Sequence, residues 1–409
     1  MDAIQYIKSV PRYLFVRGLS GWWPGVSTGN FSCIRMADVP PPEMPNGSWV
    51  RIQTRLSGIC GSDLATIRAK GSPYLSPMTS WPFVFGHEVV GKVSEKGSDV
   101  TTVSVGDRVV LEPALCCPVR GIEPMCDRCK EGAYGNCEQV MHGILAPGIQ
   151  TGYCRDTGGG WSAEFIAHDF QLHRVPDGLS DEEAVLIEPF SCCLHAALQA
   201  RPTDTDTVLV IGCGTIGLLT IAALRAIGSH CRILAMARYP HQQTFARALG
   251  ADEIIKDGRK LYETIGNETG AKQYKPEIGK PTVIGGVDTT FDCVGAAQSI
   301  DDALRLTRAR GTVAVVGMPG IPSGVDWTSI WYKELNVLGA YAYGSETYEG
   351  RRIRTFELAM RLLETHGSRL MPLVTSTYPL AQYRKAILHA IQAGKVGAVK
   401  VVFDFRIAS

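Results

Sequence analysis

The sequence predicts an α/β protein with two domains, one β-rich and barrel-like and the other built around a doubly wound parallel sheet. Three observations predict this class. The chain has 409 residues, a length typical of about two domains. Residues 50–175 contain short β-like runs that glycine, proline and aspartate interrupt. From residue 181 onwards, strand-like and helix-like segments alternate, as they do in parallel sheets.

The β-rich region is assigned from short runs of β-branched and apolar residues. Such runs occur at residues 50–54, 89–93 and 108–111. Near the C-terminus, the pattern predicts a helix over residues 351–365 and a strand over residues 399–403. Because these two elements are too few to form a domain, we expect them to return to the first one.

The second region shows the alternation of strand and helix most clearly. Apolar runs predict strands, and the segments between them predict helices: strands at 208–211, 233–236, 290–294 and 312–317, and helices at 215–227 and 299–308. Residues 262–286 have no clear period, so we expect an exposed insertion there. We place the first domain at residues 1–190, completed by 345–409, and the second at 191–344.

Composition limits the classes of partner. The chain is 45% hydrophobic and 20% charged, with a formal net charge of +1. That charge gives no electrostatic basis for binding nucleic acid or an anionic membrane. No run of about 18 apolar residues and no signal peptide is recognisable. We therefore expect a cytoplasmic protein that binds small molecules and forms a homodimer or homotetramer.

A glycine fingerprint follows the apolar run at residues 208–211. Gly212 permits a tight turn, Gly214 lets the backbone approach a pyrophosphate, and Gly217 lets the next helix pack against the strand. Thr215 and Ile216 stand between the last two glycines and belong to the same predicted site. Because the helix begins here, its N-terminus supplies positive potential for phosphates. The segment therefore predicts a nicotinamide dinucleotide site.

The residues after the second strand of this region discriminate between the two nicotinamide cofactors. An acidic residue that binds the ribose 2′-hydroxyl of NAD is expected roughly 20 residues beyond the fingerprint. Ala237 occupies that position, and Arg238 follows it. A guanidinium can bind a 2′-phosphate through charge-assisted hydrogen bonds. The sequence therefore favours NADP(H) over NAD(H).

Cys60, His87 and Glu188 supply a thiolate, an imidazole and a carboxylate from distant parts of the sequence. These are the ligand types of a catalytic Zn²⁺ that keeps one coordination position open for water or substrate. A metal of this kind beside a nicotinamide cofactor indicates redox chemistry on alcohols and carbonyl compounds.

Several separated motifs together resemble the zinc-dependent medium-chain dehydrogenase/reductase family, the alcohol dehydrogenase-like enzymes. The resemblance covers about residues 35–405, and Glu188-Pro189 is similar to its sorbitol, threonine and glucose dehydrogenase branch. It implies a GroES-like catalytic domain and a Rossmann cofactor domain. It also implies hydride transfer between an alcohol or carbonyl substrate and the nicotinamide cofactor. The motifs that carry it are residues 58–63, 86–88 and 106–109, Glu188-Pro189 and the glycine fingerprint.

The resemblance also assigns roles in the catalytic site. It implies that Cys60 and His87 are zinc ligands, whereas Glu88 and Glu188 compete for the third position. We assign Glu188 as the ligand and keep Glu88 as its alternative. By the same resemblance, Ser62 matches the hydroxyl that relays the substrate proton. Asp63 then becomes a hydrogen-bond partner of a ligand rather than a base.

A second cysteine cluster follows the pattern Glu123-x2-Cys126-x2-Cys129-x7-Cys137. In the resembled family this spacing forms a lobe that holds a structural Zn²⁺, with a fourth cysteine at the position of Glu123. A carboxylate is also a zinc ligand type, so Glu123 is the expected first ligand. Cys116 and Cys117 lie nearby in the sequence and are alternatives.

Two other functions compete with alcohol and carbonyl chemistry. One is a medium-chain reductase that acts on a conjugated C=C or C=N bond with an unused metal site. The other is a protein that binds NADP without turnover. Retention of Cys60 and His87 argues against the first function, and Ser62 beside this metal set argues against the second.

Overall fold

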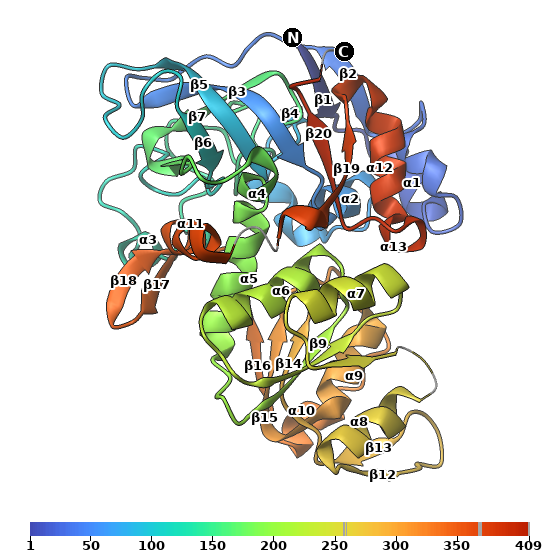
Figure 1. The fold of residues 1–409 in the computed structure, drawn as a ribbon. Helices are drawn as coiled ribbons and strands as arrows, with labels where there is room; N and C mark the ends of the chain where they lie inside the picture. Colours follow the sequence, from blue (N-terminus) through green and yellow to red (C-terminus); the bar gives the residue numbers. More distant parts are fainter. Residues whose placement is uncertain (257, 259, 367–369, 408–409) are drawn as a thin grey trace. The chain divides into compact units, whose positions relative to one another are not determined.

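A computed structural model describes residues 1–256, 258, 260–366 and 370–407 of the chain. The chain divides into two compact units (Figure 1). The first comprises Met1–Glu188 and Tyr343–Ser409, and the second comprises Pro189–Ala342. The limits expected from the sequence, 190 and 344, differ from these by two residues.

The main sheet of the first unit contains both central and C-terminal strands. Its neighbours pair antiparallel, apart from β19 and β20, which run parallel. Val402 of β20 pairs with Gly58 of β3, so the end of the chain lies beside the segment that leads to Cys60. The strand order is β19 (Val374–Tyr378), β20 (Lys400–Asp404), β3 (Trp49–Gly58), β5 (Val89–Lys96), β6 (Arg108–Leu111) and β8 (Leu172–Arg174), with β7 (Glu164–His168) also on β3.

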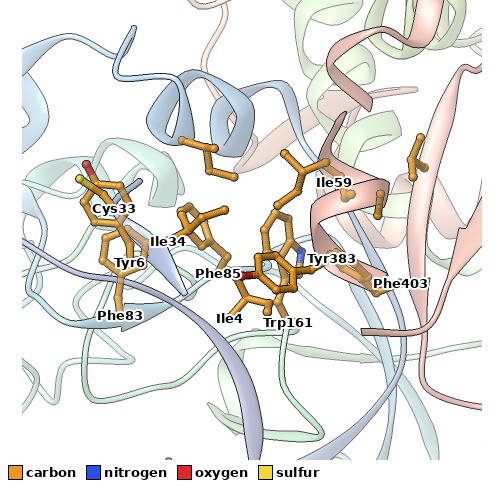
Figure 2. Close-up of a cluster of buried hydrophobic side chains, with 14 of the residues drawn as sticks. Ile4, Tyr6, Cys33, Ile34, Ile59, Phe83, Phe85, Trp161, Tyr383 and Phe403 are labelled. Carbon is orange, nitrogen blue, oxygen red and sulfur yellow. The ribbon is translucent and has the colours of Figure 1, made fainter. Parts of the chain in front are cut away.

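A smaller antiparallel sheet lies beside the main sheet (Figure 1), and an aromatic core packs within the same unit. The small sheet has the order β2 (Ile34–Asp38), β1 (Asp2–Tyr6) and β4 (Phe83–Val84). Figure 2 shows Ile59, Phe85, Trp161 and Phe403 in this core. Ile59 directly precedes Cys60, and Phe85 lies two residues before His87. Burial of these two side chains therefore anchors the backbone on both sides of the expected metal site.

The remaining elements of the first unit are short helices and one hairpin. The helices are α1 (Val10–Leu19), α2 (Gly61–Ile67), α3 (Asp127–Lys130), α4 (Asp181–Ala184), α11 (Thr355–His366), α12 (Tyr383–Ile391) and α13 (Ala393–Val396), and α5 (Ile187–Ala200) begins here. The hairpin consists of β17 (Ser345–Tyr348) and β18 (Arg351–Arg354). The prediction of a helix from residue 351 is therefore wrong over its first turn, because Arg351–Arg354 pair as a strand.

The second unit is a parallel sheet flanked by helices. Its order is β11 (Glu253–Ile255), β10 (Arg232–Met236), β9 (Thr207–Ile211), β14 (Val287–Asp292), β15 (Thr307–Val315) and β16 (Asn336–Gly339), with α6 (Thr215–Ala226), α7 (Pro240–Ala248), α9 (Ala297–Leu306) and α10 (Thr328–Tyr332). Ile211 pairs in register with both Met236 and Asp292. The strand order changes direction at β9, and ligands of such sheets bind at this point beyond the carboxyl ends of the strands.

The prediction of an exposed insertion over residues 262–286 is wrong for residues 262–269, which form a helix that packs into the core, whereas residues 270–286 are largely exposed. The segment contains α8 (Leu261–Thr269) and a hairpin of β12 (Lys272–Tyr274) and β13 (Thr282–Ile284). Tyr262, Ile265 and Val283 are buried in the core of the second unit. The many polar and glycine residues of the segment hid this short apolar stripe in the sequence.

Candidate active site and cysteine cluster

Cys60 and Ser62 lie where β3 passes into α2. Ile59 donates its backbone N–H to Val401 of β20 at 3.0 Å, which fixes the chain just before Cys60. The N–H of Cys60 then donates to Asp63 Oδ2 at 3.0 Å. These bonds hold Cys60 at the start of α2, and Ser62 lies in the first turn of the same helix.

His87 lies in the loop between β4 and β5, with a side chain that is almost fully buried. Its Nδ1 is 3.5 Å from Asp63 Oδ1, and its Nε2 is 3.4 Å from Ser62 Oγ. Metal-binding histidines commonly direct one ring nitrogen at a carboxylate and the other at the metal. The ring therefore has Nδ1 toward Asp63 and presents Nε2 on the side where Ser62 lies.

Glu88 is paired inside the protein. Its Oε2 forms an ion pair with Lys400 Nζ, and both side chains are at most 3% exposed. Lys400 Nζ also donates to the carbonyl of Ile59 at 3.4 Å. A Cβ atom at Gly58 would collide with Glu88, so only glycine fits beside this pair. Lys400 thus holds the Glu88 side chain beside Gly58, the last residue of β3.

Glu188 is the second residue of α5 and is 8% exposed. Burial raises the pKa of Glu188 to about 7, while the charge of His87 opposes this shift and that of Glu88 reinforces it. Tyr343 donates a side-chain hydrogen bond to the same carboxyl group. Glu188 therefore lies within electrostatic reach of the cluster around His87.

The cluster around His87 contains more acidic than basic groups. Burial raises the pKa of Asp63 to about 6, against the opposing charge of His87. Burial acts to lower the pKa of His87, but Asp63, Cys60 and Glu188 outweigh it and raise that pKa well above its usual value. Lys400 also belongs to this network, because the charges of Glu88, Cys60 and Glu188 act on its ammonium group. Three buried carboxyl groups and a thiol facing one lysine suit the binding of a divalent cation.

The donor set also fits zinc, because it offers sulfur, nitrogen and oxygen. The structure brings Cys60, His87, Glu88 and Glu188 into one buried network. Their ligand atoms do not all lie within 4.8 Å of one another in the part of the chain that is described. A metal would have to draw the Cys60, His87 and Glu188 side chains together.

The second cysteine cluster is more compact. Ligand atoms of four cysteines all lie within 4.8 Å of one another, and the cysteines are Cys117, Cys126, Cys129 and Cys137. Cys117 Sγ is 3.7 Å and Cys126 Sγ is 4.0 Å from Cys137 Sγ. Four sulfurs placed tetrahedrally at zinc bonding distance would be about 3.8 Å apart. The cluster therefore fits a closed structural Zn²⁺.

The expected first ligand, Glu123, is wrong because Cys117 takes that place in the cluster. The N–H of Ile122 donates to the carbonyl of Cys117 at 3.0 Å, which closes a turn and leaves Glu123 exposed beyond it. The N–H of Cys126 donates to Cys117 Sγ at 3.4 Å. An N–H directed at sulfur stabilises a thiolate. Of the two alternatives that the sequence offered, Cys116 and Cys117, it is Cys117 whose sulfur lies in the cluster.

The glycine fingerprint forms the turn between β9 and α6. Gly212 has φ of +89°, a conformation that favours glycine. A Cβ at Gly217 would collide with the carbonyl of Gly212, so Gly217 is needed for close packing of helix and strand. A Cβ at Gly214 would meet no atom within 4 Å. The protein itself leaves space in front of Gly214, where a pyrophosphate would lie against the N–H groups of Thr215 and Ile216.

Ala237 and Arg238 directly follow β10. Ala237 is buried, and its N–H donates to Ile255 of β11 at 3.1 Å. Arg238 is exposed and lies at the same sheet edge as the glycine turn, because Met236 pairs with Ile211. His241, in the first turn of α7, stacks on Tyr239 with ring centroids 5.9 Å apart. This edge thus carries basic and aromatic side chains where NAD-binding domains place a carboxylate.

Sequence reasoning did not recognise Lys400. Cys117 was only an alternative first ligand, and Tyr153 was expected only as part of residues 144–153, a region that would line the substrate pocket. The Tyr153 hydroxyl is 3.2 Å from Thr66 Oγ1 and 3.5 Å from Asp63 Oδ1. A lysine within the apolar run of residues 399–403 was an available signal, since a buried strand rarely contains an unpaired charge.

Comparisons with known proteins agree with this geometry. The family model of the alcohol dehydrogenase GroES-like domain matches residues 46–177, and that of the zinc-binding dehydrogenases matches residues 215–361. Sorbitol dehydrogenase of Arabidopsis thaliana is 30% identical over 94% of this chain and 95% of its own length. The chain belongs to the zinc-dependent medium-chain dehydrogenase family. The resemblance to its sorbitol dehydrogenase branch is thereby confirmed.

Other medium-chain dehydrogenases match over similar lengths. L-idonate 5-dehydrogenase of Vitis vinifera is 28% identical over 94% of each chain. The crystal structure of 2R,3R-butanediol dehydrogenase from Bacillus subtilis has a TM-score of 0.68 at 26% identity, covering 91% of this chain and 96% of that chain. The predicted fold class, a GroES-like domain with a Rossmann domain, is confirmed. The protein is an oxidoreductase of the zinc-dependent alcohol dehydrogenase type. Among the described residues, no helix combines the length and apolarity needed to span a membrane.

Proposed function

We propose that this medium-chain dehydrogenase oxidises one hydroxyl of a polyol and reduces the corresponding carbonyl compound, with NADP(H) as its preferred cofactor. The buried network of Cys60, His87 and Glu188 carries the proposal, because it combines zinc ligand types beside a proton-transfer residue. The names of the relatives support the substrate class, since sorbitol, idonate and butanediol all carry more than one oxygen function.

Cys60, His87 and Glu188 are the proposed ligands of the catalytic zinc. Glu88 is the weaker candidate because Lys400 already neutralises it. When bound, zinc lowers the pKa of a coordinated alcohol and polarises a carbonyl group. Asp63 would keep the His87 ring oriented through Nδ1, so that Nε2 remains directed toward the metal position.

Ser62 moves the substrate proton in this proposal. Its Oγ lies in the first turn of α2, 3.4 Å from His87 Nε2, and it also interacts with the buried hydroxyl of Tyr153. In oxidation, Ser62 Oγ accepts the proton of the substrate hydroxyl while its own proton passes to the Tyr153 hydroxyl, whose proton passes to Thr66 Oγ1 and from there to water. In reduction, the same oxygen returns a proton to the product alkoxide.

The cofactor preference rests on the sheet edge that β9 and β10 form. The backbone of Gly214, Thr215 and Ile216 would hold the pyrophosphate, and NADP supplies the position that accepts or donates hydride. Ala237 removes the carboxylate that would repel a 2′-phosphate, and Arg238 supplies a guanidinium at the next position. This edge therefore suits the phosphorylated cofactor better.

Cys117, Cys126, Cys129 and Cys137 are the proposed ligands of a second, structural zinc. Their mutual distances match a tetrahedral sulfur site that has no position left for substrate. We further propose a homodimer or homotetramer located in the cytoplasm, which sedimentation of the purified protein and imaging of a tagged copy would test.

The decisive experiment measures turnover of the purified protein with a panel of polyols and simple alcohols, using NADP and NAD in parallel. We expect oxidation of polyols, faster with NADP, by protein that contains zinc. Reduction of conjugated C=C or C=N bonds without alcohol oxidation would replace this function with the reductase alternative. Tight NADP binding without turnover of any substrate would favour a non-catalytic role.

A further inference from the structure

Arg120 is a completely buried arginine beside the cysteine cluster. All five N–H donors of its guanidinium are used, and all of them go to backbone carbonyl groups. Nε donates to Leu115 at 2.9 Å; the acceptors of Nη1 and Nη2 are His142 at 2.9 Å, Leu145 at 3.1 Å, Ala146 at 3.2 Å and Gly148 at 2.7 Å.

The hydrogen bonds of Arg120 satisfy its donors but leave its positive charge without a carboxylate. In the part of the chain that the structure describes, the guanidinium forms no ion pair within 4.0 Å. The Asp156 carboxylate lies within electrostatic range of the guanidinium but makes its close contacts with Arg155 and the N–H of Ala146. An unpaired buried charge is strongly destabilising, so a counter-charge is expected nearby.

Arg120 connects two segments that adjoin the cysteine cluster: the turn that contains Cys117 and residues 142–148, which follow Cys137. Arg120 and Cys117 belong to one turn, in which the N–H of Arg120 donates to the carbonyl groups of Cys116 and Cys117 at 3.0 and 3.1 Å. The guanidinium then binds residues 142–148, which follow Cys137. Cys154, which lies outside the cluster, is the cysteine with the largest electrostatic effect on the guanidinium, followed by Cys137 of the cluster and by Cys116.

Zinc would make this cluster the missing counter-charge. Thiols that bind zinc are deprotonated, so four thiolates with one Zn²⁺ carry a formal charge of about −2. That charge would lie in an apolar cluster formed by residues such as Leu115, Val119 and Leu145. In such surroundings an anionic centre and a guanidinium stabilise one another far more than they would in water.

We propose that Arg120 is the internal counter-ion of the zinc–tetrathiolate centre, so that zinc binding and the folding of residues 115–148 depend on its charge. This inference rests on the proposed zinc occupancy of the cysteine cluster. Arg120 is a positioning residue in this proposal, since it acts on the metal through charge and through the loop that carries Cys117.

The test uses the full chain carrying Cys60→Ser, so that zinc in the catalytic site does not contribute. Zinc content, zinc affinity by chelator competition, and Tm with zinc and after chelation are measured for this parent. The same measurements are made with Arg120→Gln, Arg120→Lys and Leu145→Ala added. Arg120→Gln removes the charge, Arg120→Lys keeps it, and Leu145→Ala weakens packing in the same cluster without changing charge.

We expect Arg120→Gln to lower zinc affinity roughly 10- to 100-fold, as loss of a group outside the ligand shell commonly does. The gain in Tm on adding zinc should shrink in Arg120→Gln and remain that of the parent in Leu145→Ala. Arg120→Lys should hold one zinc per chain with affinity closer to the parent. If Arg120→Gln does not fold, the zinc content of Arg120→Lys tests the proposal: one zinc per chain supports a role for the charge, and complete loss of zinc contradicts it.

Three results would overturn the proposal. The first is an undiminished zinc-dependent gain in Tm in Arg120→Gln. The second is loss of zinc from Arg120→Lys as complete as from Cys129→Ser, which would make the guanidinium geometry, not its charge, the requirement. The third is a parent without zinc, and this result alone would also remove the structural zinc from the proposed function.

Discussion

Lys400 Nζ forms an ion pair with Glu88 Oε2 in the interior of the first unit, and Glu88 directly follows the proposed zinc ligand His87. The pair joins the C-terminal strand β20 to the loop before β5. Because breaking a buried ion pair leaves an uncompensated charge, we expect removal of either residue alone to lower the free energy of unfolding strongly.

Replacement of Lys400 by methionine should lower the free energy of unfolding by about 3 to 5 kcal/mol, since Glu88 would remain buried without a cation. Denaturant unfolding of the zinc-loaded protein measures this change. The double variant Lys400→Met with Glu88→Gln is the matched control and should recover much of the loss. A double variant as unstable as Lys400→Met would show that the lysine acts through packing and not through the pair.

Removal of the Ser62 hydroxyl in Ser62→Ala should lower kcat on the order of 100-fold, because a proton-transfer group acts on the reaction and not on cofactor binding. Steady-state kinetics and cofactor titration measure the two effects separately. Ser62→Thr retains a hydroxyl and should keep most of the activity. Equal loss in both variants would point to packing at the start of α2.

The cofactor preference depends on Ala237 and Arg238. Arg238→Ala should weaken NADP binding about 10- to 100-fold, because charge-assisted hydrogen bonds contribute roughly 1.5 to 3 kcal/mol each. NAD binding should change little. Ala237→Asp should weaken NADP binding more than Arg238→Ala does and should strengthen NAD binding. Its carboxylate would repel the 2′-phosphate and accept a hydrogen bond from the 2′-hydroxyl of NAD. Titrations that show equal weakening of both cofactors would rule out a phosphate contact at Arg238.

Measuring the zinc content of variants tests whether Cys117, and not Glu123, binds metal in the cysteine cluster. The wild-type chain should bind about two zinc ions, one in each proposed site. Cys117→Ser and Cys129→Ser should each lose one zinc and some thermal stability, because structural zinc binding is coupled to local folding. Cys60→Ser should lose the other zinc and remain folded but inactive. Glu123→Gln is the matched control, and loss of zinc from it would restore Glu123 as a ligand.

A buried carboxylate that belongs to neither the proposed zinc site nor the cofactor site predicts the acid limit of stability. Asp181 at the start of α4 binds Arg55 at 2.8 Å, Arg108 at 3.1 Å and Arg406 at 3.0 Å. Burial acts to raise the pKa of Asp181, but the three arginines outweigh it and lower that pKa below its ordinary value. The stabilisation is therefore complete above the ordinary aspartate pKa and is lost as pH falls through the lowered value.

Asp181→Asn should accordingly reduce stability at pH 7 by about 3 to 5 kcal/mol. The difference from the wild type should narrow only below about pH 4. Thermal unfolding over pH 3 to 8 measures both curves. The exposed residue Asp177 supplies the control Asp177→Asn, which should follow the wild type throughout. A difference that is constant down to pH 3 would exclude ionisation of Asp181 as the cause.

Local patterns in the sequence predicted the elements whose chemistry is local. The glycine turn at Gly212 and the strands on each side of it follow from neighbouring residues, whereas the expectation that Cys60 and His87 belong to one site came from the family resemblance. Lys400 could not be joined to Glu88 in this way, because their contact depends on the register of β20 against β3. Cys117 required the turn at Arg120, whose hydrogen bonds reach residues 142–148. Tyr262 and Ile265 form too short an apolar stripe to reveal α8 amid polar residues.

The pairing of β20 with β3 also determines when this protein can become active during synthesis. Lys400 is 341 residues from its carbonyl partner Ile59, whereas the second unit is one continuous stretch of chain. Domains generally fold as units while the ribosome still elongates the chain. The cofactor domain can therefore fold early, but Glu88 lacks its lysine partner until Lys400 has been synthesised and has left the ribosome. The surroundings of the proposed catalytic zinc are therefore completed only when β20 pairs with β3, so a chain that stops before Lys400 should lack activity.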